Sequence, residues 1–261
     1  SQRRVSIRSA GRCRGIRPGM VNSSRSEYLQ AMGIQSWVRR DVQAEDVPYG
    51  PPDGEFPVGR ASTGPRPVES FDWPELQSCV AACTGCELHR TRTQTVFGTG
   101  NRQADWMIIG EAPGADEDRQ GEPFVGRAGQ LLTEMLSATG QQRQDVFITN
   151  ILKCRPPQNR DPRPAEVASC HAWLQRQIAL VRPSLILAVG RIAAHNLLET
   201  DVPVGRLRGR IHHYGEGRIP LIVTYHPAYL LRSPLEKRKS WDDLRLALQV
   251  SPAQQREPSG S

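Results

Sequence analysis

The chain has 261 residues, and its 34 lysines and arginines outnumber its 27 aspartates and glutamates, giving a formal net charge of +7. This length supports one substantial hydrophobic core with appendages, or two small domains. No apolar run approaches the roughly 20 residues that cross a bilayer, and the arginine-rich start lacks the apolar centre of a signal peptide. The composition therefore excludes a membrane-spanning protein, and we expect a cytoplasmic one.

Residues 1–70 differ in composition from the rest of the chain. Residues 1–19 hold six arginines and no acid, which leaves 28 basic against 27 acidic residues in the remainder. Three interpretations of this arm stay open: a disordered arm, a phosphate-contacting arm, or sequence upstream of a start at Met20. Residues 23–40 predict a short helix, and residues 41–70, with six prolines and four glycines, have the composition of a linker.

Residues 71–250 are predicted to form the folded domain, and residues 251–261 a loose tail. Four runs in this domain are apolar throughout, which indicates strands buried on both faces of a parallel sheet. The predicted strands are 106–109, 146–149, 185–189 and 221–225, and the predicted helices are 128–139, 165–181, 191–198 and 241–248. This alternation predicts an α/β fold: a three-layer α/β/α sandwich with a central, mostly parallel four-stranded sheet.

Polar and glycine-rich residues follow the predicted strands. The run GEAPGADEDRQGEPFVG, residues 110–126, follows the first strand, and Asn150, Gly190 and His226 follow the other three. Because the carboxyl ends of such strands form the ligand-binding edge of the sheet, we expect these residues to gather around one pocket. Each of them taken alone also suits a turn, a cap or the core. Their convergence favours a pocket for a heteroaromatic base.

Four cysteines have the spacing of a metal site. Cys83 and Cys86 form a tight pair, and Cys154 and Cys170 follow after 67 and then 15 intervening residues. Four thiolates bind either an iron-sulfur cluster or a structural zinc ion, and the single tight pair favours iron. The alternative is that all four are ordinary buried cysteines.

A second charge feature lies near the C-terminus. Residues 205–245 hold nine basic against four acidic side chains. This local surplus predicts a surface that contacts phosphates.

Together, the run GEAPGADEDRQGEPFVGRAGQLL, the segment TNILKCRPPQNRDP, the segment HPAYLLR and the cysteine spacing resemble a family 4 uracil-DNA glycosylase, the iron-sulfur branch of that superfamily. The resemblance covers about residues 79–248. It implies an enzyme that hydrolyses the N-glycosidic bond of uracil flipped out of DNA. It also implies a 4Fe-4S cluster on Cys83, Cys86, Cys154 and Cys170.

The resemblance further implies a monomer that works on uracil-containing DNA in the bacterial cytoplasm, at the nucleoid, with no membrane partner. The resemblance says nothing about residues 1–70, and this N-terminal region is the candidate site for a repair or replication protein partner.

The resemblance assigns three residues to the flipped base. Phe124 matches the aromatic that stacks on it. Asn150 matches the amide that pairs with uracil O4 and N3, a pattern that the cytosine edge does not fit. His226 matches the imidazole near uracil O2, where negative charge develops as the bond breaks.

The carboxylates are harder to assign. Gly110 and Ala112 belong to the substrate-binding turn, but Ala112 stands where the best-studied branch of the superfamily has the aspartate that positions water. Glu111 is then the first choice for this task, with Asp118 behind it. Glu117 matches a residue walling the place of thymine's C5 methyl group. The structural alternative is that these acids cap the turn.

Two residues are expected to contact DNA. Leu230 matches the wedge that enters the duplex where uracil left, and Arg232 would meet a phosphate. The alternative is that residues 229–231 start a helix and pack inward.

The sequence also admits two other functions. One is a non-hydrolytic DNA- or repair-complex-binding module of the same fold, which Asn150 and His226 argue against. The other is a relative that becomes covalently trapped on its product, which is disfavoured because residues 155–163 contain no histidine.

Overall fold

The computed structural model describes residues 66–251 of the chain. The predicted arm, the helix at 23–40, most of the linker and the tail therefore lie outside the described residues. The first described element is the 3-10 helix η1 (Val68–Ser70), and the last is helix α9 (Lys237–Val250). Within the described range, no helix combines the length and hydropathy needed to cross a membrane.

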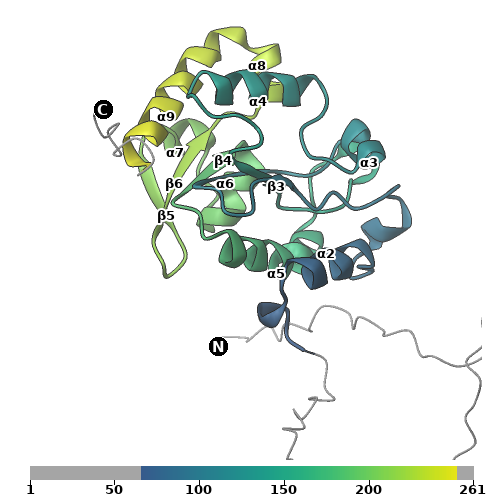
Figure 1. Cartoon of the computed structure of the whole chain (residues 1–261). Helices are drawn as coiled ribbons and strands as arrows, with labels where there is room; N and C mark the ends of the chain where they lie inside the picture. The colour runs from purple at the N-terminus through teal and green to yellow at the C-terminus, as the bar shows by residue number, and fades with distance from the viewer. Residues whose placement is uncertain (1–65, 252–261) are drawn as a thin grey trace, which may run out of the picture. The chain divides into compact units, whose positions relative to one another are not determined.

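One mixed sheet forms the centre of the fold (Figure 1). Its strands follow the order β1-β3-β2-β4-β6-β5, with the four central strands parallel and both edge strands antiparallel to their neighbours. The strands are β1 (Thr99–Gly100), β2 (Trp106–Gly110), β3 (Phe147–Asn150), β4 (Leu185–Val189), β5 (Ile211–Tyr214) and β6 (Ile219–Thr224).

The four predicted strands are the four parallel strands, but the sheet has six strands rather than four. Strand β1 has two residues, which is too short to produce a hydrophobic pattern. Strand β5 reads IHHY with alternating exposure, because an edge strand with one solvated face carries polar side chains. Neither edge strand has the continuous apolar run by which the central strands were found.

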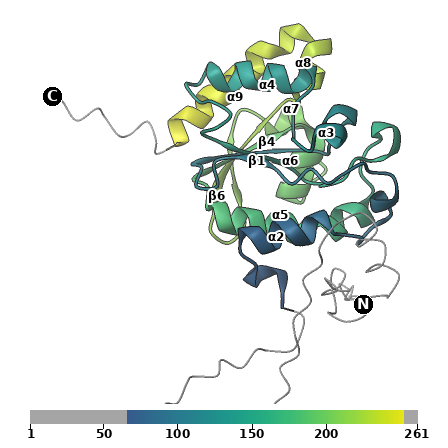
Figure 2. The same cartoon turned by 45° about the vertical axis from the view of Figure 1, so that its right-hand side comes forward.

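Alternating side chains of the central strands enter two separate cores. In β2, Met107 and Ile109 pack in the core covered by α5 (Pro164–Val181) and α6 (Arg191–Leu198), whereas Trp106 and Ile108 pack in the opposite core. That second core is covered by α4 (Arg127–Ser137), α8 (Pro227–Arg232) and α9. Figure 2 shows the sheet between these two helix layers. The three-layer α/β/α prediction is confirmed.

Helices α4, α5, α6 and α9 correspond to the four predicted helices. The structure adds four short helices, α2 (Trp73–Ala81), α3 (Ala115–Gln120), α7 (Val204–Leu207) and α8, and the 3-10 helices η2 (Glu87–Arg90), η3 (Pro157–Asn159) and η4 (Pro234–Glu236). The added helices have four to nine residues, which is too few for the 3.6-residue period to stand out in the sequence.

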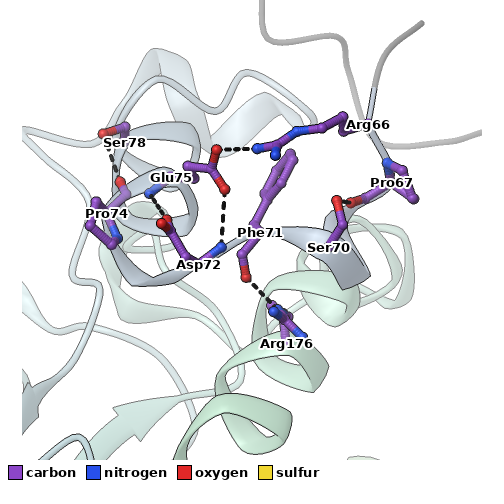
Figure 3. Close-up of polar contacts among 9 residues, drawn as sticks. All are labelled: Arg66, Pro67, Ser70, Phe71, Asp72, Pro74, Glu75, Ser78 and Arg176. Atoms are coloured by element: carbon purple, nitrogen blue, oxygen red, sulfur yellow. Dashed lines mark hydrogen bonds and ion pairs between the residues drawn. The ribbon is translucent and has the colours of Figure 1, made fainter. Parts of the chain in front are cut away.

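The start of the described chain is fastened to helix α5 (Figure 3). Asp72 and Glu75 form a capping box at α2, with the Glu75 backbone N–H donating to Asp72 Oδ1 over 2.9 Å and the Asp72 N–H donating to Glu75 Oε2 over 3.1 Å. Arg176 on α5 donates from Nε to the carbonyl oxygen of Phe71 over 2.6 Å. Helix α2 leads to Cys83, and α5 carries Cys170. These contacts therefore hold the segment that leads to Cys83 against the helix that carries Cys170.

Candidate active site and cysteine pocket

A pocket of about 780 Å³ opens at the carboxyl ends of the parallel strands, and we call it the strand-end pocket. Seven of the predicted site residues line it: Glu111, Ala112, Glu117, Phe124, Asn150, His226 and Arg232. They come from three separate segments of the chain: residues 111–124 after β2, Asn150 at the end of β3, and residues 226–232 after β6, which include α8. The expected gathering at one edge of the sheet is therefore present.

Gly110, at the end of β2, makes the closest approach within this site possible. A Cβ atom on Gly110 would lie 2.5 Å from Asn150 Oδ1 and 2.5 Å from Phe124 Cζ. Gly190 does the same for the imidazole, because its Cβ atom would lie 2.9 Å from His226 Cβ and its φ is +93°. Two glycines thus let the amide, the aromatic ring and the imidazole crowd together.

Phe124 is held by the carboxylate of Glu117. Glu117 Oε1 accepts from the backbone N–H groups of Val125 (3.1 Å) and Gly126 (3.3 Å), and Oε2 accepts from Gly114 (3.1 Å). Between these anchors Phe124 has a φ of 55°, an uncommon conformation for a bulky residue that the loop must impose. Its ring stacks against His226, with centroids 5.6 Å apart and planes inclined by 28°.

His226 is positioned as a neutral hydrogen-bond donor. Its Nδ1 accepts from the backbone N–H of Ala228 over 3.1 Å, so the proton of the neutral ring resides on Nε2. Burial, reinforced by Arg232 and opposed by Glu117, lowers the pKa of His226 to about 4. The ring is therefore uncharged at neutral pH.

The two candidate water-orienting carboxylates lie in different environments. Glu111 lines the strand-end pocket, and burial, reinforced by Asp161 and opposed by Arg191, raises its pKa above the usual range. Asp118 is 3% exposed, lies outside the pocket lining, and has both carboxylate oxygens 3.0 Å from the Thr93 backbone N–H. The prediction that Asp118 binds substrate is therefore corrected, because its carboxylate holds the loop at Thr93. Of the two carboxylates, Glu111 is the one that lines the pocket and stays the candidate for orienting water.

The assignment of Leu230 to the duplex is also corrected. Leu230 is 1% exposed and belongs to the core between the sheet and helices α4, α8 and α9. Its neighbour Leu231 is 37% exposed, and Leu235 on η4 is 93% exposed. The inward-packing alternative describes Leu230, and the exposed apolar side chains lie one and five residues further along the chain.

The segment after Cys154 supplies lining residues that sequence reasoning did not select. Asn159 and Arg160 both line the strand-end pocket. Asn159 has a φ of 54°, and Arg160 donates to both oxygens of Glu166 over 2.9 and 2.6 Å. Glu166 also accepts from the Arg163 N–H over 2.8 Å, so one buried carboxylate ties this loop to the start of α5. The available signal was the position of these residues in the segment RPPQNRDP.

The four predicted cysteine ligands line a second pocket, which we call the cysteine pocket. Its lining consists of Val80, Cys83, Gly85, Cys86, Arg92, Lys153, Cys154, Ser169, Cys170 and Trp173. All four cysteines are free thiols. Within residues 66–251, however, no three or more His, Cys, Asp or Glu side chains are grouped around the position of a single metal ion.

Hydrogen-bond donors surround the four sulfur atoms. Arg92 donates from Nη1 to Cys154 Sγ over 3.0 Å, and the indole Nε1 of Trp173 is buried without a partner among the described residues. Burial raises the pKa of the Cys170 thiol to about 12. Burial also lowers the pKa of Lys153 to about 7, against the opposing effect of Cys170 and Cys154. The pocket thus combines sulfur ligands with cationic and N–H groups.

Comparison with known proteins identifies relatives of this chain. The family model of the Uracil DNA glycosylase superfamily matches residues 97–245. The chain is 44% identical to a type-4 uracil-DNA glycosylase of Archaeoglobus fulgidus over 68% of this chain and 92% of that protein. It is also 44% identical to the type-4 enzymes of Pyrobaculum aerophilum (67% of this chain, 93% of that protein) and Thermotoga maritima (59% and 80%).

Proposed function

The chain belongs to the uracil DNA glycosylase superfamily, and from this premise we propose that it hydrolyses the N-glycosidic bond of uracil in DNA. The observation that carries the proposal is the strand-end pocket, where an aromatic ring, an amide, a neutral imidazole and a carboxylate line one cavity. These four kinds of group suit base removal, because the base must be held, read, activated and displaced by water. The type-4 names of the relatives support the same activity.

Recognition falls to Phe124 and Asn150. The uracil leaves the base stack and enters the pocket, where stacking on an aromatic ring contributes about 1–3 kcal/mol per base. The Asn150 amide offers both an acceptor for uracil N3–H and a donor for O4. Cytosine presents the reverse pattern, so its binding leaves a buried polar group unpaired.

Bond cleavage falls to His226 and Glu111. The His226 Nε2–H donates to uracil O2, where negative charge collects as the bond between C1′ and N1 breaks. A neutral donor suits this task because it stabilises the anion without giving up its proton. Glu111 orients a water molecule toward C1′, and the water oxygen forms the new bond while its proton passes to solvent through the carboxylate.

Residues of α8 and η4 contact the DNA that flanks the uracil. Arg232 lines the pocket and carries a positive charge to the nearest phosphates. Leu231 and Leu235 replace Leu230 as the apolar groups that meet the opened base stack. Leu235 is followed within three residues by Lys237 and Arg238, which suits a surface pressed against DNA.

We assign a 4Fe-4S cluster to Cys83, Cys86, Cys154 and Cys170. The partnerless Trp173 N–H and the Arg92 guanidinium fit a cluster better than zinc, because a cluster adds sulfide acceptors that a bare ion does not have. When bound, the cluster supplies cross-links between loops, since hydrolysis of this bond transfers no electrons.

The cluster assignment also supports a proposal for the cellular compartment of the protein. Free cysteines that await a cluster suit a reducing compartment, so we propose that the protein works in the cytoplasm, as a monomer on DNA. The region before residue 66 is proposed to bind a repair or replication protein.

Release of uracil from an oligonucleotide under single-turnover conditions tests the proposed function. Wild-type protein is expected to release the base, and Asn150→Ala to lower the rate at least about tenfold, the effect of one modest lost contact. Asn101→Ala, in the turn before β2, is the matched control and should keep the wild-type rate. DNA binding without base release by the wild type would favour the binding-module alternative.

The colour and metal content of anaerobically purified protein test the cofactor separately. A 4Fe-4S protein is brown, with four iron atoms per chain and broad absorption near about 400 nm. A colourless protein holding one zinc ion would overturn the cluster assignment and leave the glycosylase proposal untouched.

A further inference from the structure

Lys153 is a fully buried lysine that lines the cysteine pocket and donates a hydrogen bond to Asn150, a residue of the strand-end pocket. It is 1% exposed, it lines the cysteine pocket, and it lies three residues beyond Asn150 and directly before Cys154. Lysines are almost never fully buried unless their charge is compensated. None of the ion pairs formed within residues 66–251 includes Lys153, so its neighbours in the cysteine pocket are the groups that can compensate it.

The other neighbours of the Lys153 amine belong to the end of strand β3. Nζ donates to the hydroxyl of Thr149 over 2.7 Å and to the backbone carbonyl oxygen of Asn150 over 2.8 Å. The Thr149 hydroxyl in turn lies 3.0 Å from the carbonyl oxygen of Phe97 and 3.3 Å from Oε1 of Gln177. A buried polar network therefore holds the last two residues of the strand.

This network determines where the Asn150 side chain can point. The amide leaves the same residue whose carbonyl Lys153 holds, and Oδ1 has little freedom because it packs close to Gly110. The peptide that follows Asn150 is held from both sides, because the Ile151 N–H donates to the Gly110 carbonyl oxygen over 2.9 Å and Lys153 Nζ donates to the Asn150 carbonyl oxygen. A small rotation of this peptide would move the amide away from the base.

We propose that Lys153 is a positioning residue that links the cysteine pocket to base recognition, by fixing the Asn150 peptide from the side of the four sulfur atoms. The inference rests on the proposed function and deepens it. Loss of the link lowers the affinity for uracil without lowering the affinity for undamaged DNA, because Lys153 is buried and does not reach the surface that DNA would contact. A residue that served only to stabilise the fold would not separate these two affinities.

Arg92 provides the matched control. Like Lys153 it is a cation beside the cysteine pocket, where it donates to Cys154 Sγ, but its other hydrogen bond goes to the carbonyl oxygen of Ala81 rather than to β3. Lys153→Met and Arg92→Met therefore each remove one basic nitrogen donor beside the same pocket. They differ in the contact with Asn150.

The experiment measures inhibition of uracil release by free uracil, together with binding of uracil-free duplex DNA and the metal content of each holoprotein. Lys153→Met is expected to raise the inhibition constant about tenfold, the effect of one lost buried hydrogen bond, with DNA affinity and metal content unchanged. Arg92→Met is expected to keep the wild-type inhibition constant. The proposal is overturned if Lys153→Met keeps the wild-type constant, or if both variants raise it equally.

A second variant covers the case in which Lys153→Met does not fold. Thr149→Val removes the hydroxyl that Lys153 shares with Phe97 and Gln177, at a position outside the lining of both pockets. It should raise the uracil inhibition constant several-fold, and an unchanged constant overturns the proposal. Wild-type protein that neither releases nor binds uracil would instead contradict the proposed function itself.

Discussion

The strand-end pocket and the cysteine pocket share one stretch of chain, yet they are built in opposite ways. Asn150 and Cys154 are four residues apart, and each contributes to a different pocket. Two carboxylates, three arginines and an uncharged imidazole line the strand-end pocket, whereas Arg92 and Lys153 are the basic side chains among the four cysteines of the cysteine pocket. One pocket is suited to stabilising negative charge on a departing base, and the other to balancing negative charge on thiolate ligands.

The difference also extends to how each pocket is held in shape. The strand-end pocket depends on close packing around glycines and on backbone N–H groups that grip Glu117. The cysteine pocket is lined by cysteines from loops and from α5, which the proposed cluster would cross-link. Stability is therefore expected to be most sensitive to changes in the cysteine pocket, and catalysis to changes in the strand-end pocket.

Loss of a cysteine ligand should have the largest effect. Cys154→Ser is expected to lower metal content and to lower the melting temperature by roughly 10 °C, because a structural metal site contributes several kcal/mol to folding. Ser169→Ala, which also lines the cysteine pocket, is the control and should melt near the wild type. Differential scanning calorimetry with metal analysis checks this prediction. An unchanged melting temperature would show that the metal site does not contribute to the stability of the fold.

Crowding the strand-end pocket should have the second-largest effect. Gly110→Ala places a Cβ atom against both Asn150 and Phe124, so single-turnover uracil release should fall about a hundredfold, or 2.7 kcal/mol of transition-state stabilisation. Gly217→Ala is the control, because its Cβ atom would meet nothing within 4 Å. Metal content should be unchanged in both. Equal rates in the two variants would mean that the contact with Gly110 does not determine the site.

The pH profile separates the two acid-base groups of the strand-end pocket. Burial raises the pKa of Glu111, so its carboxylate becomes protonated, and the rate should fall, as the pH decreases through a value above its usual range. His226, with a pKa of about 4, stays neutral across that interval and should add no inflection near 6.5. Glu111→Gln should lower the rate about tenfold and abolish the acidic limb. An acidic limb that survives in this variant would assign it to another group.

Substitutions of two leucines, Leu230 on α8 and Leu235 on η4, should give the smallest effect on DNA binding. Leu235→Ala should weaken binding of uracil-containing duplex about threefold, the loss of modest apolar contact, and leave the melting temperature unchanged. Leu230→Ala is the contrasting substitution, because it empties a core position and should lower stability before DNA affinity. Fluorescence anisotropy and thermal melts distinguish the two. The reverse pattern would return Leu230 to the DNA surface.

Much of the fold was readable in the sequence because its signals are local. The four parallel strands are runs of consecutive apolar residues, and the observed strands begin and end within two residues of the predicted ones. The strand-end residues Glu111, Asn150 and His226 were found because a parallel sheet brings its carboxyl ends to one edge. The edge strand β5 was missed because its IHHY pattern has no apolar run.

Some assignments required knowledge of which side chains face each other. Asp118 and Glu111 are both acids in the same glycine-rich run, and what separates them is the Thr93 backbone, which lies 25 residues from Asp118 in the sequence. Leu230 and Leu231 are adjacent and chemically identical, and the helix α8 turns one into the core and the other to the surface. No local pattern distinguishes such pairs.

The sequence by itself determined the parallel sheet, the layering of helices around it and the set of chemical groups at its edge, because hydrophobic runs and motif order lie along the chain. Only the tertiary structure decided which carboxylate faces the strand-end pocket, which leucine is buried, and that Lys153 spans from the cysteine pocket to Asn150. Burial and hydrogen-bond partners depend on contacts between residues distant in sequence, and these contacts exist only once the sheet has assembled.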